Sequence, residues 1–94
     1  MHVISRKALK LFWESYQDSE IALLRWFKIM GKTQFDDFAA LRRTFPSADK
    51  VGSTVVFNIG GNKYRLITII HFNRRKVYIR HVLTHKQYDK GDWK

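Results

Sequence analysis

A group of side chains that can transfer protons and hold anions lies in residues 84–89, where His85, Lys86 and Tyr88 follow one another closely. In one helical turn, His85 and Tyr88 would be neighbours at the i, i+3 spacing. When the 2′-hydroxyl of RNA attacks the neighbouring phosphate and cleaves the strand, a base must remove the hydroxyl proton, cations must hold the phosphate and an acid must protonate the leaving oxygen. Histidine, lysine or arginine, and tyrosine can supply these groups without a metal ion. An ordinary exposed histidine at a strand end is the alternative for His85, but its neighbours favour a catalytic role.

The elements that must position this group are strands, because 55–57 and 66–70 are short runs of β-branched and aromatic residues. Gly60-Gly61-Asn62 allows the positive φ angles of a tight reversal, and 73–76 separates the next two strands. We expect an antiparallel meander with strands at 54–59, 63–72 and 76–84. His2 is expected to open a short additional strand.

The two faces of this sheet follow from the register of its last two strands. If Arg74-Arg75 is the hairpin tip, Phe72 pairs with Val77 and Leu66 pairs with Leu83. Alternation then gives an apolar face that should pack on helices, made of Leu66, Ile70, Phe72, Val77, Ile79 and Leu83. His81 falls on this side as a core histidine. The opposite, open face carries Lys63, Arg65, His71, Tyr78 and Arg80 among Ile67, Ile69 and Val82.

The predicted open face combines cations with aromatic and apolar side chains and has no carboxylate. Arginine makes bidentate contacts with phosphate, and aromatic rings stack on bases. A solvated surface whose charges only maintain solubility is the alternative, but such surfaces normally mix both signs. We therefore predict an RNA-binding face. The predicted catalytic residues are Arg65, Arg80, His85 and Tyr88, and the predicted RNA contacts are Asn62, Lys63, His71, Tyr78 and Lys86.

The first half of the chain has the spacing of amphipathic helices. Leu9, Phe12, Trp13 and Tyr16 predict a helix over 5–16 capped by Ser5, and Leu23, Trp26, Phe27 and Met30 predict a second helix ended by Gly31. A capping box at 33–36 should begin a short third helix, with Phe38, Leu41 and Phe45 on one face, that stops before Pro46. We expect one α+β domain over 1–94.

Charge and composition narrow the class of protein. The formal net charge is +10, and residues 50–88 contain eight lysines and arginines but no aspartate or glutamate. Such a field attracts polyanions. Without cysteine there is no disulfide, thiolate zinc site or thiol nucleophile. Four scattered histidines predict no metal site, and no motif predicts a cofactor. We find no signal peptide or membrane span and expect a cytoplasmic protein.

Two segments, 56–66 with its Tyr64-Arg65-Leu66 and 78–89, closely resemble the HigB toxins, a branch of the RelE superfamily. Phe45-Pro46-Ser47 and the opening residues are similar too. The resemblance implies N-terminal helices packed on a curved antiparallel sheet, with the active site on its concave side. It implies a metal-independent messenger RNA endonuclease that acts on ribosomes, inhibits translation and is silenced by a HigA-like helix-turn-helix antitoxin. Arg65, Arg80 and Tyr88 match family positions, whereas His85 and Lys86 match a more variable part.

Two other functions fit the same sequence. A non-catalytic RNA-binding or ribosome-binding protein would use the open face for affinity alone. A structural partner protein would present this basic face to an acidic subunit and bind RNA weakly.

Overall fold

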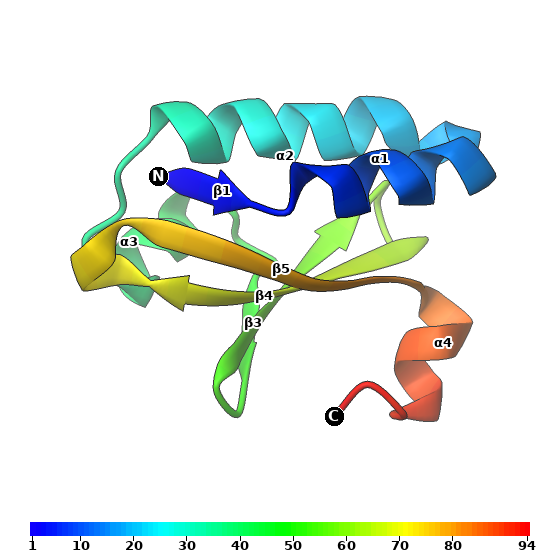
Figure 1. Ribbon diagram of the computed structural model, residues 1–94. Helices are drawn as coiled ribbons and strands as arrows, with labels where there is room; N and C mark the ends of the chain where they lie inside the picture. The colour runs from blue at the N-terminus through cyan, green and yellow to red at the C-terminus, as the bar shows by residue number, and fades with distance from the viewer.

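The computed structural model describes all residues 1–94, in which the first two long helices lie on one side of a sheet and the last helix lies beneath its other side (Figure 1). In chain order the elements are β1 (His2–Ile4), α1 (Arg6–Ser15), the 3-10 turn η1 (Gln17–Ser19), α2 (Glu20–Lys32), α3 (Phe38–Thr44), β2 (Asp49–Val51), β3 (Thr54–Ile59), β4 (Tyr64–His71), the 3-10 turn η2 (Phe72–Arg74), β5 (Lys76–Thr84) and α4 (His85–Lys90). The predicted α+β class and the antiparallel meander β3-β4-β5 are confirmed.

The sheet has five strands in the order β1-β5-β4-β3-β2. The strand expected at His2 is present as β1, and it pairs with β5 in parallel. The sheet is therefore mixed, and the expectation of a wholly antiparallel sheet is wrong at this edge. At the other edge, β2 pairs with β3 through a turn at Gly52, whose φ of 59° favours glycine. No helix is long and apolar enough to cross a membrane.

The first two helices form where the apolar spacing predicts them, but two of their predicted ends are wrong. Ser5 precedes α1 with φ 80° and makes no side-chain capping bond, because the chain turns sharply there between β1 and the helix. Helix α2 continues through Gly31 to Lys32. The amino group of Met1 donates to the carbonyls of Met30 and Thr33, so the end of α2 needs no glycine cap.

The third helix begins later than the capping-box pattern at 33–36 predicts. Phe35 is buried in the core, and residues 33–37 form no helix. Asp37 caps α3 instead, with its carboxylate accepting a 2.8 Å bond from the Ala40 amide. Leu41 of α3 is fully buried, and the ring of Phe45 meets that of Phe57 edge-on.

One apolar core lies between the helices and the inner face of the sheet. Leu9, Leu23 and Met30 come from the helices and are fully buried. The strands add alternate residues to the same cluster: Val55, Phe57, Ile59, Tyr64, Leu66, Val77 and Ile79. The opposite face of β3, β4 and β5 therefore has no helical layer over it, except where α4 and residues 91–94 lie beneath one end (Figure 1).

The predicted register of β4 and β5 is wrong in two ways. Residues 72–74 form a turn, so Ile70 rather than Phe72 pairs with Val77, a shift of two that leaves the faces unchanged. Farther along, Thr68 pairs with Ile79 but Ile67 pairs with His81. Arg80 is thus the extra residue of a β-bulge.

The bulge exchanges the two faces for the rest of β5. His81 and Leu83, predicted on the core side, lie on the open face opposite Ile67 and Arg65. Val82, predicted on the open face, packs against the core. An added residue changes the alternation by one, which no period-two pattern in the sequence reveals.

Candidate functional site

Arg65 is the most firmly held cation of the open face, with an exposed fraction of 8%. Its guanidinium donates to the backbone carbonyls of Asn62 and Tyr64, each at 3.2 Å, and to the Asn62 side-chain oxygen at 2.6 Å. These bonds brace the turn between β3 and β4. A guanidinium has five N–H donors, so donors remain free for an anion. Asn62, predicted to contact RNA, contacts Arg65.

Tyr88 from α4 lies against Arg65, with the guanidinium carbon 5.5 Å from its ring centroid. Its other face stacks on Trp93 at 5.1 Å with an interplanar angle of 15°. The Trp93 indole N–H donates to the Tyr88 carbonyl at 3.0 Å. Arg65, Tyr88 and Trp93 thus form one column, with the Lys94 ammonium 5.8 Å from the Trp93 ring. Because both faces of Tyr88 are covered, its hydroxyl is the part available for chemistry.

Helix α4 holds this column because its first turn is well capped. The Thr84 hydroxyl accepts from the Gln87 amide, and the Gln87 side chain accepts from the Thr84 amide, which is a capping box. Gly91 ends the helix with φ 80°, which turns residues 92–94 back toward the sheet. The helix begins at His85, whose backbone N–H donates to the Lys63 carbonyl at 3.0 Å.

Arg65 and Tyr88 line a hollow of about 340 Å³ between the open face and the segment before β2. Sequence reasoning missed its other polar groups, which are Arg42, Ser47, Asp49 and Asn58. Asn58 could have been found, because it lies opposite Arg65 in β3 on the same face. Arg42 comes from α3, Ser47 from the loop after it and Asp49 from β2, and the predicted sheet places none of them.

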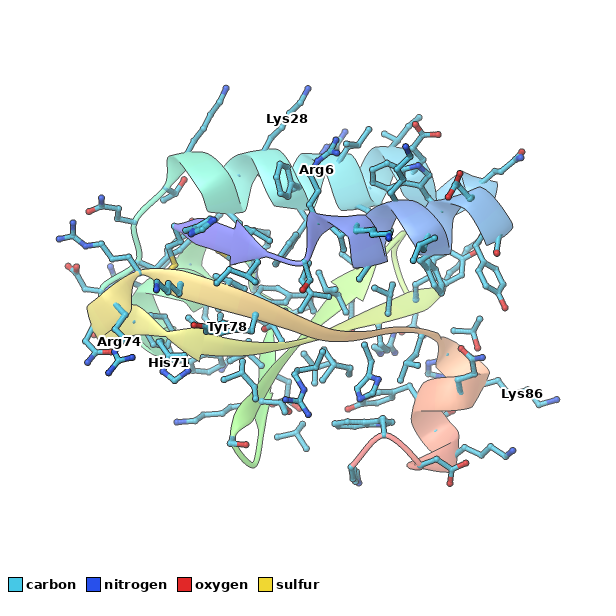
Figure 2. The ribbon with its side chains drawn as sticks, in the orientation of Figure 1. Arg6, Lys28, His71, Arg74, Tyr78 and Lys86 are labelled. Carbon is cyan, nitrogen blue, oxygen red and sulfur yellow. The ribbon has the colours of Figure 1, made fainter.

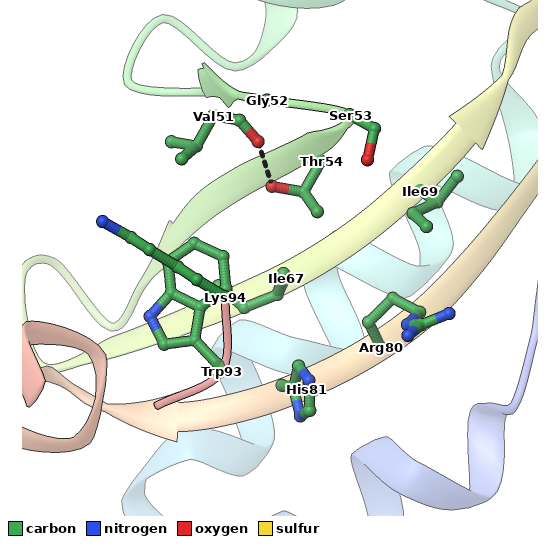
Figure 3. A pocket seen from close by; sticks show the side chains of 10 residues that line it. All are labelled: Val51, Gly52, Ser53, Thr54, Ile67, Ile69, Arg80, His81, Trp93 and Lys94. Atoms are coloured by element: carbon green, nitrogen blue, oxygen red, sulfur yellow. Dashed lines mark hydrogen bonds between the residues drawn. The ribbon is translucent and has the colours of Figure 1, made fainter. Parts of the chain in front are cut away.

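Arg80 lies in a neighbouring hollow of about 380 Å³, which also contains His81 and Trp93 (Figure 3). The bulge at Arg80 explains why both residues of this pair point to the open side of β5. His81 was predicted in the core and Trp93 was not singled out at all. Trp93 connects the two groups, because it stacks on Tyr88 and also lines the Arg80 hollow.

His71 and Tyr78 occupy the far end of the open face, where their rings meet edge-on at 5.4 Å (Figure 2). They line a third hollow of about 310 Å³, which shares Ile69 and Arg80 with the hollow of His81. The three residues His71, Tyr78 and Arg80 therefore border one connected track along β4 and β5.

The structure separates the remaining predicted residues from these hollows. His85 pairs with Asp89 on α4, with 3.2 Å between Nε2 and the carboxylate, and lines none of the three hollows. Lys86 points away from the molecule (Figure 2). Lys63 binds Asp18 at 3.1 Å beside the helices.

Asp18 also accepts a hydrogen bond from the Tyr64 hydroxyl. That bond and the contact with Lys63 lower the pKa of Asp18. The same bond, with burial, raises the pKa of Tyr64 to about 12. This polar group fastens the end of β4 to the helical layer and does not face the hollows.

Taken together, the open face presents one fixed arginine, Arg65, and one exposed arginine, Arg80, beside a phenol and an imidazole. Arginine and a hydroxyl or imidazole can bind a phosphate and move protons around it. A group of three or more histidine, aspartate or glutamate side chains able to hold a metal ion is not present.

Comparisons with known proteins identify the family of this chain. A family model for HigB_toxin, the RelE-like toxic component of a toxin-antitoxin system, matches residues 19–91. The mRNA interferase toxin HigB of Escherichia coli K12 is 38% identical over 92 residues, which cover 95% of this chain and 88% of that relative. The mRNA interferase HigB of Shigella flexneri gives the same values. A further mRNA interferase HigB, from Escherichia coli O6:H1, is 28% identical over 93 residues, covering 96% of this chain and 90% of that protein. The chain therefore belongs to the HigB toxin family.

Proposed function

We propose that this chain is a messenger RNA endonuclease that acts on the ribosome and thereby inhibits translation. The observation that carries the proposal is the pairing of Arg65 with Tyr88 beside the Arg80–His81 hollow, on a sheet face with no helical layer. Its relatives bear the name mRNA interferase. The protein would act in the cytoplasm as a single domain over residues 1–94.

The two arginines would hold the phosphate. Arg65 is immobilised by its three hydrogen bonds, so it can meet the charge that develops on the phosphate without reorganising. Arg80 makes no side-chain hydrogen bond within the chain and remains free to follow the RNA backbone. Their bidentate geometry suits phosphate oxygens.

Proton transfer would then fall to His81 and Tyr88. One takes the proton of the 2′-hydroxyl as that oxygen attacks the phosphorus, and the other gives a proton to the departing 5′-oxygen. The P–O5′ bond breaks, which leaves a 2′,3′-cyclic phosphate and a 5′-hydroxyl. His81 replaces His85 in this scheme because it shares the hollow with Arg80, whereas His85 pairs with Asp89.

The family is that of a toxin with an antitoxin, so an antitoxin is a partner. We propose that it is a HigA-like helix-turn-helix protein. The other partner in the proposal is messenger RNA on the ribosome, drawn by the net charge of +10.

A Tyr88→Phe variant tests the proposal with little disturbance, because it keeps the ring between Arg65 and Trp93 and removes only the hydroxyl. We expect messenger RNA cleavage on ribosomes to fall by about 10² to 10⁴-fold with the melting temperature unchanged. Tyr16→Phe on the helical side is the matched control and should cleave normally.

The alternative, a non-catalytic ribosome-binding protein, predicts a different result. Wild-type protein would then block translation without cutting the message, and Tyr88→Phe would block it equally well. Cleavage by Tyr88→Phe at the wild-type rate would exclude the tyrosine from proton transfer.

A further inference from the structure

The hollow beside Arg80 has the size and lining of a small-molecule site. Its volume of about 380 Å³ falls within the range of about 300 to 1,000 Å³ that is common for ligand pockets. The floor is made of Ile67 and Ile69, one wall is the Trp93 ring, and the Val51–Thr54 turn closes the opposite side (Figure 3). Arg80 and His81 complete the third side.

We infer that this hollow binds one unpaired base of the RNA, stacked on Trp93, next to the bond that is cut. The inference rests on the proposed function and deepens it by assigning a base-binding subsite. Trp93 lies outside residues 19–91, the part of the chain that the family model matches.

Trp93 is positioned before any RNA arrives. Its ring is stacked on Tyr88, its indole N–H is bonded to the Tyr88 carbonyl, and Gly91 sets the turn that brings it back to the sheet. Little conformational freedom would be lost when a base stacks on it, which favours binding. The column also joins the subsite to Tyr88, so a base held on Trp93 places its own phosphate near Arg65 and Arg80.

Lys94 does not block this arrangement. Its ammonium group lies 5.8 Å from the Trp93 ring, at the end of a long and flexible side chain. A base can replace it over the ring, and the displaced ammonium can then reach a phosphate of the same strand.

The lining favours a base over a cationic or a purely apolar ligand. The floor is apolar and suits the flat face of a base, and no aspartate or glutamate side chain lines the hollow to hold a cation. The rim offers Ser53, Arg80 and His81 for the polar edge of a base. The Thr54 hydroxyl holds the turn by its 2.7 Å bond to the Val51 carbonyl. Single-stranded RNA is recognised in this way, by stacking and by contacts to base edges.

The neighbouring hollow supports a strand running through the subsite. It shares Ile69 and Arg80 with the base hollow and leads to His71 and Tyr78. An RNA strand could lay one base against Trp93 and continue past Arg80 along this track.

The first test uses ribosome-bound messages that lack a single base at each position around the cleavage site. For wild-type protein, removal of one particular base should slow single-turnover cleavage by about 10 to 100-fold, the value of a stacked base. Trp93→Leu should slow cleavage of the intact message by a similar factor. Removal of that same base from the message should then slow cleavage by Trp93→Leu no further. Equal penalties in both proteins would overturn the inference.

The second test fills the hollow without touching Tyr88. Ile69→Trp places a large ring over the floor and should slow cleavage by about 10 to 100-fold, at an unchanged melting temperature. Ile21→Trp, at an exposed position of α2, is the matched control and should cleave as wild type does. Equal cleavage by both variants would overturn the subsite.

A binding measurement separates this inference from the proposed function. Single-stranded oligonucleotides should quench part of the tryptophan fluorescence, and Trp93→Leu should abolish that part even if no RNA is cut. If wild-type protein cuts messages but this quenching persists in Trp93→Leu, the subsite is refuted and the endonuclease proposal stands. If quenching requires Trp93 but no message is cut, the endonuclease proposal fails and the base site remains.

Discussion

Replacing Arg65 by alanine should weaken the fold as well as the activity, because this side chain is nearly buried and bonded to Asn62 and Tyr64 at the β3–β4 turn. A hydrogen bond from a charged donor contributes about 1.5 to 3 kcal/mol. The two bonds of 3.2 Å are long, so each should contribute an energy at or below the low end of that range. The Asn62 side chain is exposed, so in the variant water can bond to its oxygen. We therefore expect the free energy of unfolding to fall by about 2 to 3 kcal/mol.

For a domain of this size, that loss lowers the melting temperature by about 10 to 20 °C. Arg80→Ala is the matched control, since Arg80 is exposed and makes no side-chain hydrogen bond, and its unfolding free energy should stay within about 0.5 kcal/mol of wild type. Thermal melts followed by circular dichroism, run beside cleavage assays, measure both effects.

We expect both Arg65→Ala and Arg80→Ala to lose cleavage, but only Arg65→Ala to lose stability. Arg65→Lys should recover only part of both, because an ammonium cannot reproduce the planar fork of a guanidinium. An Arg65→Ala protein that melts within about 3 °C of wild type would refute the bracing role that we assign to this arginine.

Four further outcomes are expected. Leu66→Ala should cost about 2 to 5 kcal/mol of stability in denaturant titrations, whereas the same change at exposed Leu11 should stay within about 0.5 kcal/mol. Tyr64 should ionise near pH 12 in ultraviolet titrations. Because its pKa is raised on folding, Tyr64 contributes stability up to about pH 10, and that contribution is lost as the pH rises toward 12. Because the pKa of Asp18 is lowered on folding, its carboxylate stabilises the fold at pH values above the ordinary pKa of aspartate. Asp18→Asn should therefore lose less stability on acidification than wild type, measured by urea titration at pH 7 and about pH 3. Thr84→Ala should loosen α4, raise its amide exchange and lower stability by about 1 kcal/mol, and equal exchange rates would contradict its capping role.

Much of the fold follows from local patterns that the sequence displays. The apolar spacing of Leu9 and Leu23 predicts two helices, and the Gly60-Gly61 turn predicts a hairpin at the observed place. These signals depend on neighbouring residues alone, so they can be read without the rest of the structure.

The site depends on features that have no local signal. The bulge at Arg80 arises from how two strands meet, and it moves His81 from the predicted core to the open face. Trp93 lies far along the chain from β4 and comes into place only through the fold of α4. The end of α2 depends likewise on a distant group, the amino group of Met1, rather than on Gly31.

The parallel pairing of β1 with β5 sets an order of events during synthesis. Residues 2–4 are made early, but their partners at 76–78 leave the ribosome only after most of the chain has been translated. Until then β1 has no neighbour, and the strand that carries Arg80 and His81 does not yet exist. An unfinished chain therefore cannot act on the ribosome that is making it. Fragments that stop before β5 would lack both the closing strand and the RNA face.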